Sequence, residues 1–131
     1  MKVTLLQSDI LKGDTPANLA HLDDLLSPLS KGDTDLIVMP EMFHCGFTFD
    51  PKSNADSGSG TAIAWMLNKA ALLNAHVCGS VSYPHENKWY NRLVVAAPNG
   101  SVTSYDKRHL FSMGSETEVY SAGNDRVIVT N

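Results

Sequence analysis

The sequence has few cysteines and no excess of positive charge, and both shortages limit what the protein can be. Its 131 residues include 2 cysteines, Cys45 and Cys78, which are too few for a disulfide framework. The 10 Lys and Arg residues are outnumbered by 14 Asp and Glu residues, which gives a formal net charge of -4. Nucleic acid is therefore not expected as a partner, because nucleic-acid-binding domains usually carry a basic surface.

Long apolar runs are also missing. No stretch reaches the roughly 18 apolar residues that mark a membrane-spanning helix, so no membrane partner is expected. The opening MKVTLLQSDI has a short apolar run that polar residues interrupt, and this predicts a strand rather than a signal peptide. Reduced thiols and the lack of an export signal together favour a cytoplasmic location.

The sequence does contain the composition and the element order of an α/β domain. Hydrophobic residues make up 43% of the chain and charged residues 18%, which is typical of a globular protein, and no boundary divides residues 1–131. The PNG sequence at 98–100 predicts a hairpin turn. We expect helices packed on a mixed sheet. Apolar stretches predict its strands at 3–6, 36–40, 75–81, 89–97, 101–106 and 126–131.

Two helices are expected between the first three strands. Asp14 or Thr15 is placed to cap the first helix, and Pro28 predicts that this helix ends just before it. Ser59 or Thr61 is placed to cap the second helix, which has an apolar stripe at helical spacing.

Two charged residues directly follow predicted strands. Glu41 comes after LIVMP, and Lys107 comes after SVTSYD. Because ligand sites in open α/β sheets gather at the carboxyl ends of strands, we expect both side chains to face one crevice. Such a pair suits acyl-transfer chemistry, in which one group moves protons and the other stabilises negative charge. A purely structural ion pair is the alternative that the spacing leaves open.

The residues around these two positions resemble the nitrilase (carbon–nitrogen hydrolase) superfamily. The resemblance rests on PEMF and GF at 40–47, YDKRHLF at 105–111 and YSAGN at 120–124, in that order. PEMFHCGF together with YDKRHLF is most similar to the ω-amidase-like branch. The resemblance implies an α-β-β-α sandwich, of which this chain would be the incomplete N-terminal part. It also implies hydrolysis of a small linear amide without a metal or an organic cofactor, and a homodimer or higher homo-oligomer.

The resemblance implies roles for five residues. Glu41 would be the general base, and Lys107 would stabilise the oxyanion of the tetrahedral intermediate. Glu116 would position the lysine or the substrate, and its spacing to YSAGN favours it over Glu118. Phe43 and Phe111 would help to line the pocket.

The nucleophile that the family requires has no match in this sequence. The family's cysteine lies downstream of the lysine, after the strand that RVIVTN begins, and the sequence stops at Asn131. Cys78 is expected to be a buried strand residue. Cys45, beside His44, is expected in the pocket wall rather than as the nucleophile. This chain alone should therefore be inactive.

Three hypotheses follow from this missing cysteine. The chain is the N-terminal part of an amidase, or a catalytically inactive module that binds a small amide or another subunit, or an assembly domain. A metal site is not expected, because the spacing of the histidines and cysteines fits no standard zinc pattern.

Overall fold

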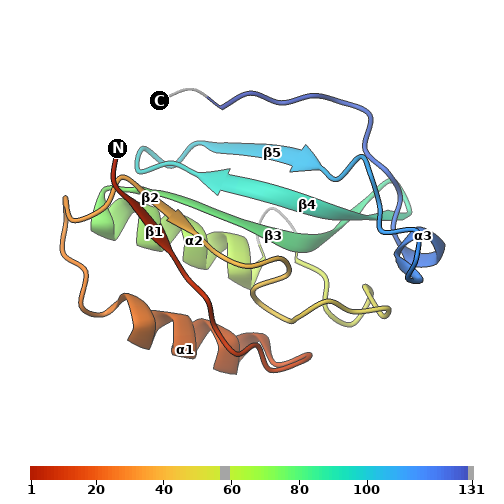
Figure 1. Ribbon diagram of the computed structural model, residues 1–131, viewed down its shortest axis with the longest axis horizontal. Coiled ribbons are helices and arrows are strands. Elements are labelled where there is room, and N and C mark those ends of the chain that lie inside the picture. Colours follow the sequence, from red (N-terminus) through yellow and green to blue (C-terminus); the bar gives the residue numbers. More distant parts are fainter. Residues whose placement is uncertain (57–59, 130–131) are drawn as a thin grey trace.

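The computed structural model describes residues 1–56 and 60–129, which form one mixed sheet with two longer helices packed against it (Figure 1). This agrees with the α/β class expected from the sequence. The elements in chain order are β1 (Val3–Leu5), α1 (Thr15–Leu26), β2 (Leu36–Val38), α2 (Thr61–Leu73), β3 (His76–His85), β4 (Lys88–Ala96), β5 (Val102–Asp106) and α3 (Glu116–Val119).

The strands lie in the sheet in the order in which they occur in the chain. β1 pairs with β2 and β2 with β3 in parallel, whereas β4 is antiparallel to both β3 and β5. The predicted hairpin around PNG is confirmed, with Gly100 at a φ of 85°. A second hairpin joins β3 to β4 through Glu86 and Asn87, which have φ values of 47° and 60°. The third strand, expected to end at Val81, thus continues to His85, and this longer pairing was not predicted.

The two helices begin differently. Asp14 caps α1 as expected, and its side chain accepts a hydrogen bond of 3.0 Å from the backbone N–H of Ala17. α2 begins after Gly60, so Thr61 is its first helical residue and its expected capping role is wrong. Ser59, the other expected cap, lies outside the described residues. No helix in the described ranges is long and apolar enough to cross a membrane.

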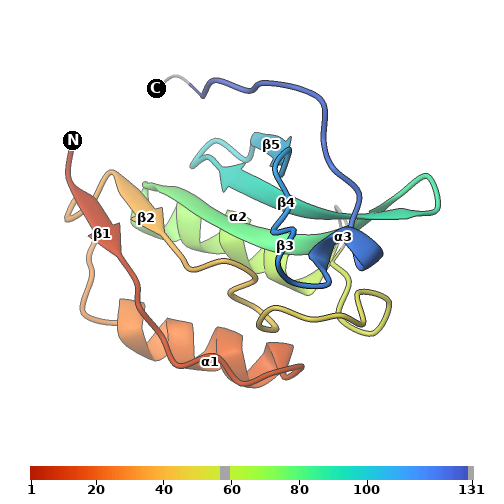
Figure 2. The ribbon, with the colours of Figure 1, turned by 45° about the vertical axis from the view of Figure 1, so that its right-hand side comes forward.

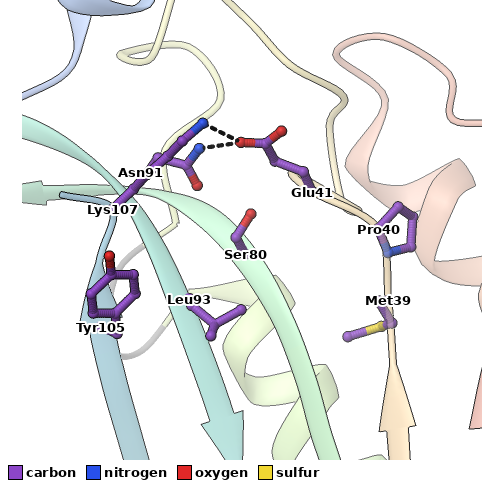
Figure 3. A pocket seen from close by; sticks show the side chains of 8 residues that line it. All are labelled: Met39, Pro40, Glu41, Ser80, Asn91, Leu93, Tyr105 and Lys107. Atoms are coloured by element: carbon purple, nitrogen blue, oxygen red, sulfur yellow. Dashed lines mark hydrogen bonds and ion pairs between the residues drawn. The ribbon is translucent and has the colours of Figure 1, made fainter. Parts of the chain in front are cut away.

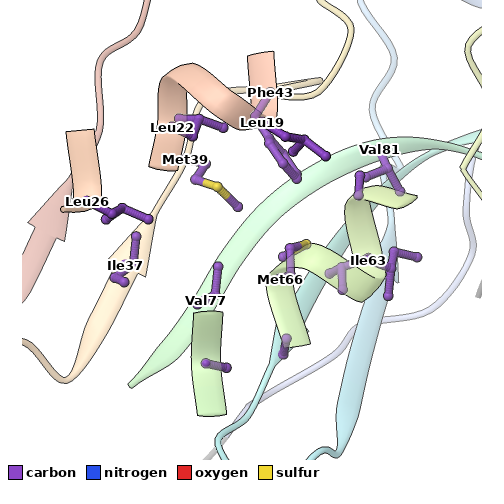
Figure 4. Close-up of a cluster of buried hydrophobic side chains, with 14 of the residues drawn as sticks. Leu19, Leu22, Leu26, Ile37, Met39, Phe43, Ile63, Met66, Val77 and Val81 are labelled. Carbon is purple, nitrogen blue, oxygen red and sulfur yellow. The ribbon is translucent and has the colours of Figure 1, made fainter. Parts of the chain in front are cut away.

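The main core lies between the sheet and the helices, which cover the same face (Figures 1 and 2). Strand residues that point to this face include Ile37 and Val77, which are directly paired and have no exposed surface. Leu22 of α1 and Met66 of α2 pack onto them from the helices (Figure 4). The apolar stripe of the second helix therefore predicted correctly which side of α2 is buried.

The opposite face of the sheet is covered only in part. Residues 120–129 run back over it after α3 (Figures 1 and 2). Val127 and Val129 line a cavity there together with Leu93 and Val95 of β4. A strand was expected at 126–131, but residues 126–129 have no strand pairing in the described part of the chain, and 130–131 lie outside it. We call this face of the sheet the uncovered face, because α1 and α2 both pack on the other one. It carries the charged residues that follow β2 and β5.

Candidate active site

The turn after β2 places Glu41 at the edge of the uncovered face. The backbone N–H of Met39 donates to the carbonyl of Cys78 in β3, which keeps the chain paired just past the strand. Met42 then adopts a φ of 51°, a left-handed conformation that is uncommon for a residue with a side chain. Its N–H donates to the hydroxyl of Ser80 over 3.0 Å, and this bond holds the turn. The Glu41 carboxylate is therefore presented from a constrained turn.

Lys107 is placed by two backbone hydrogen bonds directly after β5. Its N–H donates to the carbonyl of Asn91 in β4 over 2.9 Å, and its carbonyl accepts from the N–H of Gly123 over 3.0 Å. A Cβ atom on Gly123 would lie 2.3 Å from the carbonyl oxygen of Asp106, so no other residue fits there without a shift of the backbone. Strand pairing and the returning segment thus fix the lysine from two sides.

Glu41, Lys107 and Glu116 converge on one point, as the sequence predicts for the first two. Lys107 Nζ lies 3.0 Å from Oε1 of Glu41 (Figure 3). It also lies 3.1 Å from Oε1 and 3.0 Å from Oε2 of Glu116. One ammonium therefore contacts two carboxylates, whose residues lie 66 and 9 positions from Lys107 in the sequence.

Glu116 is the buried member of this cluster, with an exposed fraction of 1%. Burial alone would raise the pKa of its carboxyl group, but hydrogen bonds from the backbone of Phe111, from Asn91 and from Lys107 outweigh it, and the pKa is lowered. The bond from the Phe111 N–H is 2.6 Å long. Glu116 is thus held as a carboxylate.

Lys107 is held in its charged form by the same contacts. Burial would lower the pKa of its ammonium, but hydrogen bonds and charges from Glu116 and Glu41 outweigh this and raise the pKa. Glu41 is the most accessible of the three, with half of its side chain exposed. The cluster therefore combines a fixed cation, a buried carboxylate that anchors it and a carboxylate that a substrate can reach.

A pocket of approximately 260 Å³ opens beside Glu41 and Lys107 (Figure 3). Its remaining lining comes from the end of β2 and from the uncovered face of β3, β4 and β5, namely Met39, Pro40, Ser80, Asn91, Leu93 and Tyr105. Sequence reasoning missed Asn91, which donates its side-chain amide to both Glu41 and Glu116. A signal was present, because asparagine is depleted from strands and yet lies inside WYNRLVVAA.

The two phenylalanines expected at the pocket lie elsewhere. Phe43 is fully buried in the main core, where its ring packs against Trp65 at a centroid distance of 6.0 Å. Phe111 is 59% exposed, and it contributes to the cluster through its backbone N–H. Neither ring is among the side chains that line the pocket in the described part of the chain.

Cys45 is not in the pocket wall, and this expectation is wrong. Its side chain has no exposed surface and lies in a second core cluster with Met42 and Tyr120. Burial, followed by the charge of Asp56, raises the pKa of the thiol to about 11. The neighbouring His44 Nε2 lies 3.5 Å from Cys45 Sγ, but burial lowers the pKa of His44 to about 4. A neutral thiol beside a neutral imidazole does not form a reactive thiolate at neutral pH.

Comparison with known proteins identifies the family. The model of the carbon-nitrogen hydrolase family matches residues 2–130. Omega-amidase YafV of Escherichia coli (strain K12) is 42% identical over 129 residues, which are 98% of this chain and 49% of the relative. An (R)-stereoselective amidase of a Pseudomonas species is 30% identical over 95% of this chain and 45% of its own length. The chain thus spans about half the length of the curated relatives it matches.

Solved structures show the same fold. XC1258 from Xanthomonas campestris, a CN-hydrolase superfamily protein with an arsenic adduct in its active site, superposes with a TM-score of 0.94 and 37% identity. The superposition covers 99% of this chain and 49% of that protein. Nit3 of Saccharomyces cerevisiae, a member of the nitrilase superfamily, shares the fold at a TM-score of 0.76 over 95% of this chain and 49% of its own. The chain belongs to the carbon–nitrogen hydrolase family.

Proposed function

We propose that the protein containing this chain hydrolyses the terminal amide of a small linear substrate and releases ammonia, as an ω-amidase does. The observation that carries the proposal is the contact of one ammonium, Lys107 Nζ, with both Glu41 and Glu116 at the mouth of a pocket. The family membership and the relatives named as amidases support the same reaction class.

Each charged residue has a proposed role that its surroundings support. Glu41 is the general base, since its carboxylate is accessible and lies at the pocket. Lys107 stabilises the oxyanion of the tetrahedral intermediate, because its charge is fixed in place before the reaction begins. Glu116 positions Lys107 and does not reach the substrate, because it is buried behind the ammonium.

The nucleophile is proposed to be a cysteine outside these 131 residues. The thiol proton passes to Glu41, the resulting thiolate attacks the amide carbon, and the C–N bond breaks as the nitrogen takes that proton and leaves as ammonia. Water then hydrolyses the thioester with Glu41 again accepting a proton. Cys45 does not replace this nucleophile, because it is buried and its thiol is protonated.

A small pocket favours a small substrate. The volume of approximately 260 Å³ lies below the roughly 300–1,000 Å³ typical of drug-sized ligand sites. Leu93 and Met39 supply apolar walls, and the charged cluster lies at one end. We propose an amide such as succinamate, with a short aliphatic chain against these walls and the amide carbon at Lys107. A cytoplasmic homo-oligomer is part of the same proposal, and the two free thiols are compatible with that location.

Ammonia release tests the proposal. The full-length protein should release ammonia from succinamate, and the 131-residue chain alone should not. Robust release by the isolated chain would contradict an external nucleophile. Tight amide binding by the full-length protein without any release would instead favour the second candidate, a catalytically inactive nitrilase-like module that binds small molecules or assembles with another subunit. Its support is that no reactive thiol is found among the described residues.

A further inference from the structure

Asn91 donates both hydrogens of its side-chain amide into the charged cluster. Its Nδ2 donates to Oε1 of Glu41 and, over 3.1 Å, to Oε1 of Glu116. The residue is 3% exposed and lies in β4, directly beside Ser82 of β3. Because the amide nitrogen has two hydrogens, these two bonds use its whole donor capacity.

The contact makes the two oxygens of Glu41 unequal. Oε1 accepts from both Asn91 and Lys107. Within residues 1–56 and 60–129, Oε2 has no hydrogen-bond partner. Two donors at one oxygen fix the rotation of a carboxylate whose side chain is otherwise half exposed. Oε2 is thereby left as the oxygen that can accept a proton.

We propose that Asn91 is a positioning residue, which holds Oε1 of Glu41 so that Oε2 receives the proton of the nucleophile. The inference rests on the proposed role of Glu41 as the general base. In the step concerned, the thiol proton moves to Oε2, the thiolate remains as the nucleophile, and the same proton later goes to the leaving nitrogen. Asn91 neither gains nor loses a proton in this step.

A neutral amide suits this position better than a charged side chain. Two carboxylates share one ammonium here, so a further carboxylate would add repulsion. A second lysine or arginine would compete with Lys107 for the same oxygens. The backbone carbonyl of Asn91 accepts the backbone N–H of Lys107, a bond that does not depend on the side chain, so the side-chain amide is tested separately from the placement of the lysine.

The substitution Asn91→Asp separates positioning from packing, because the two side chains have nearly the same shape. At neutral pH the new carboxylate cannot donate and repels both glutamates. When it is protonated it regains one O–H donor. The titratable groups around it are Glu41 after β2, Tyr105 and Lys107 at the end of β5, and Glu116 on α3. Tyr120 lies behind Ser82, to which its hydroxyl donates, and the uncharged Ser80 and Ser82 complete the neighbourhood on β3.

The test is the pH dependence of kcat and KM for succinamate hydrolysis by the full-length protein. For Asn91→Asp we expect kcat to fall about 100-fold at neutral pH while KM changes less than about threefold. The loss should shrink as the pH is lowered. The control Asn99→Asp, the same change in the exposed β4–β5 turn, should follow the wild type. A profile of Asn91→Asp parallel to that of the wild type, or a loss confined to KM, would overturn the inference.

A second measurement does not depend on activity or on the stability of that variant. In NMR spectra of the full-length protein, Glu41→Gln should shift one Nδ2 proton of Asn91, and Glu116→Gln should shift the other. If the wild type is active but Glu41→Gln leaves the chemical shifts of both Asn91 Nδ2 protons unchanged, the positioning role is rejected. The amidase proposal is then unaffected. An inactive wild type that shows both shifts would reject the amidase proposal and support the contact that the positioning role requires.

Discussion

Lys107 Nζ lies 3.0 Å from Oε2 of Glu116, a carboxylate with an exposed fraction of 1%. The lysine is therefore paired with a fully buried acid behind it and a half-exposed acid, Glu41, in front of it. A lysine held in this way keeps its position whether or not a substrate is bound. Such preorganisation is what makes a fixed charge effective toward an oxyanion.

Removal of this lysine should cost stability as well as activity. In Lys107→Ala the buried Glu116 carboxylate keeps hydrogen bonds from Phe111 and Asn91 but loses its counter-charge. We expect a loss of about 1–3 kcal/mol in the free energy of unfolding at neutral pH. The loss should shrink in acid, because protonation of Glu116 removes the unpaired charge. Denaturant unfolding at several pH values measures this, and the exposed Lys12→Ala is the matched control. A deficit that does not change with pH would contradict the pairing.

Gly123 should tolerate no side chain. A Cβ atom would lie 2.3 Å from the carbonyl oxygen of Asp106, and we expect the backbone shift that relieves this clash to weaken the Gly123–Lys107 backbone bond. Gly123→Ala should therefore lower kcat at least about tenfold by moving Lys107. The control is Gly114→Ala, whose new methyl meets only the exposed ring of Phe111, which can move aside. Equal kinetics for the two variants would contradict the role given to Gly123.

His44 should make the fold sensitive to mild acid. Burial lowers its pKa from 6.5 to about 4, so the folded protein binds fewer protons at this site than the unfolded chain. The free energy of unfolding is therefore unaffected by this histidine above about pH 6.5, and it decreases as the pH falls toward 4. This difference corresponds to on the order of 3 kcal/mol. Glu116, whose pKa is also lowered, contributes in the same direction but only below its ordinary value of 4.5.

The histidine variants separate these contributions. His44→Gln should flatten the dependence of unfolding free energy on pH between about 6.5 and 4.5. His21→Gln, on the exposed side of α1, should leave the dependence as in the wild type. If His44→Gln and the wild type had the same slope in this range, the assignment of the slope to His44 would be wrong.

Cys45 should be dispensable for turnover. Its thiol is buried against Met42 and Tyr120, so Cys45→Ala removes packing and leaves the charged cluster untouched. We expect kcat within about twofold of the wild type and a loss of about 1 kcal/mol in stability, typical of a small cavity. Steady-state kinetics and thermal unfolding measure the two effects. A loss of turnover in a stably folded Cys45→Ala protein would instead indicate that Cys45 takes part in catalysis.

The sequence predicted the fold class, both helices and the meeting of Glu41 with Lys107, because these follow from local patterns and from strand ends. It did not predict that Phe43 faces the core. Phe43 follows Met42, whose left-handed backbone redirects the chain, and no local signal indicates such a turn for methionine. The β3–β4 hairpin was missed because its turn, Glu86 and Asn87, has no glycine.

The side-chain partners of Asn91 were not predictable from the sequence for a different reason. Its importance arises from two carboxylates that lie 50 and 25 residues away in the chain, and only the folded sheet brings them to one amide. Asparagine inside a strand marks an unusual position, but it does not say which partners the side chain has.

Glu41→Gln tests the proposed role of Glu41 as the general base of an amidase. The variant keeps the shape of the side chain and an oxygen that can accept hydrogen bonds, but it cannot take a proton. In the full-length protein, kcat/KM for ammonia release from succinamate should fall at least about 1,000-fold, with the melting temperature nearly unchanged. Near-normal ammonia release by a stably folded Glu41→Gln protein would show that Glu41 is not the general base.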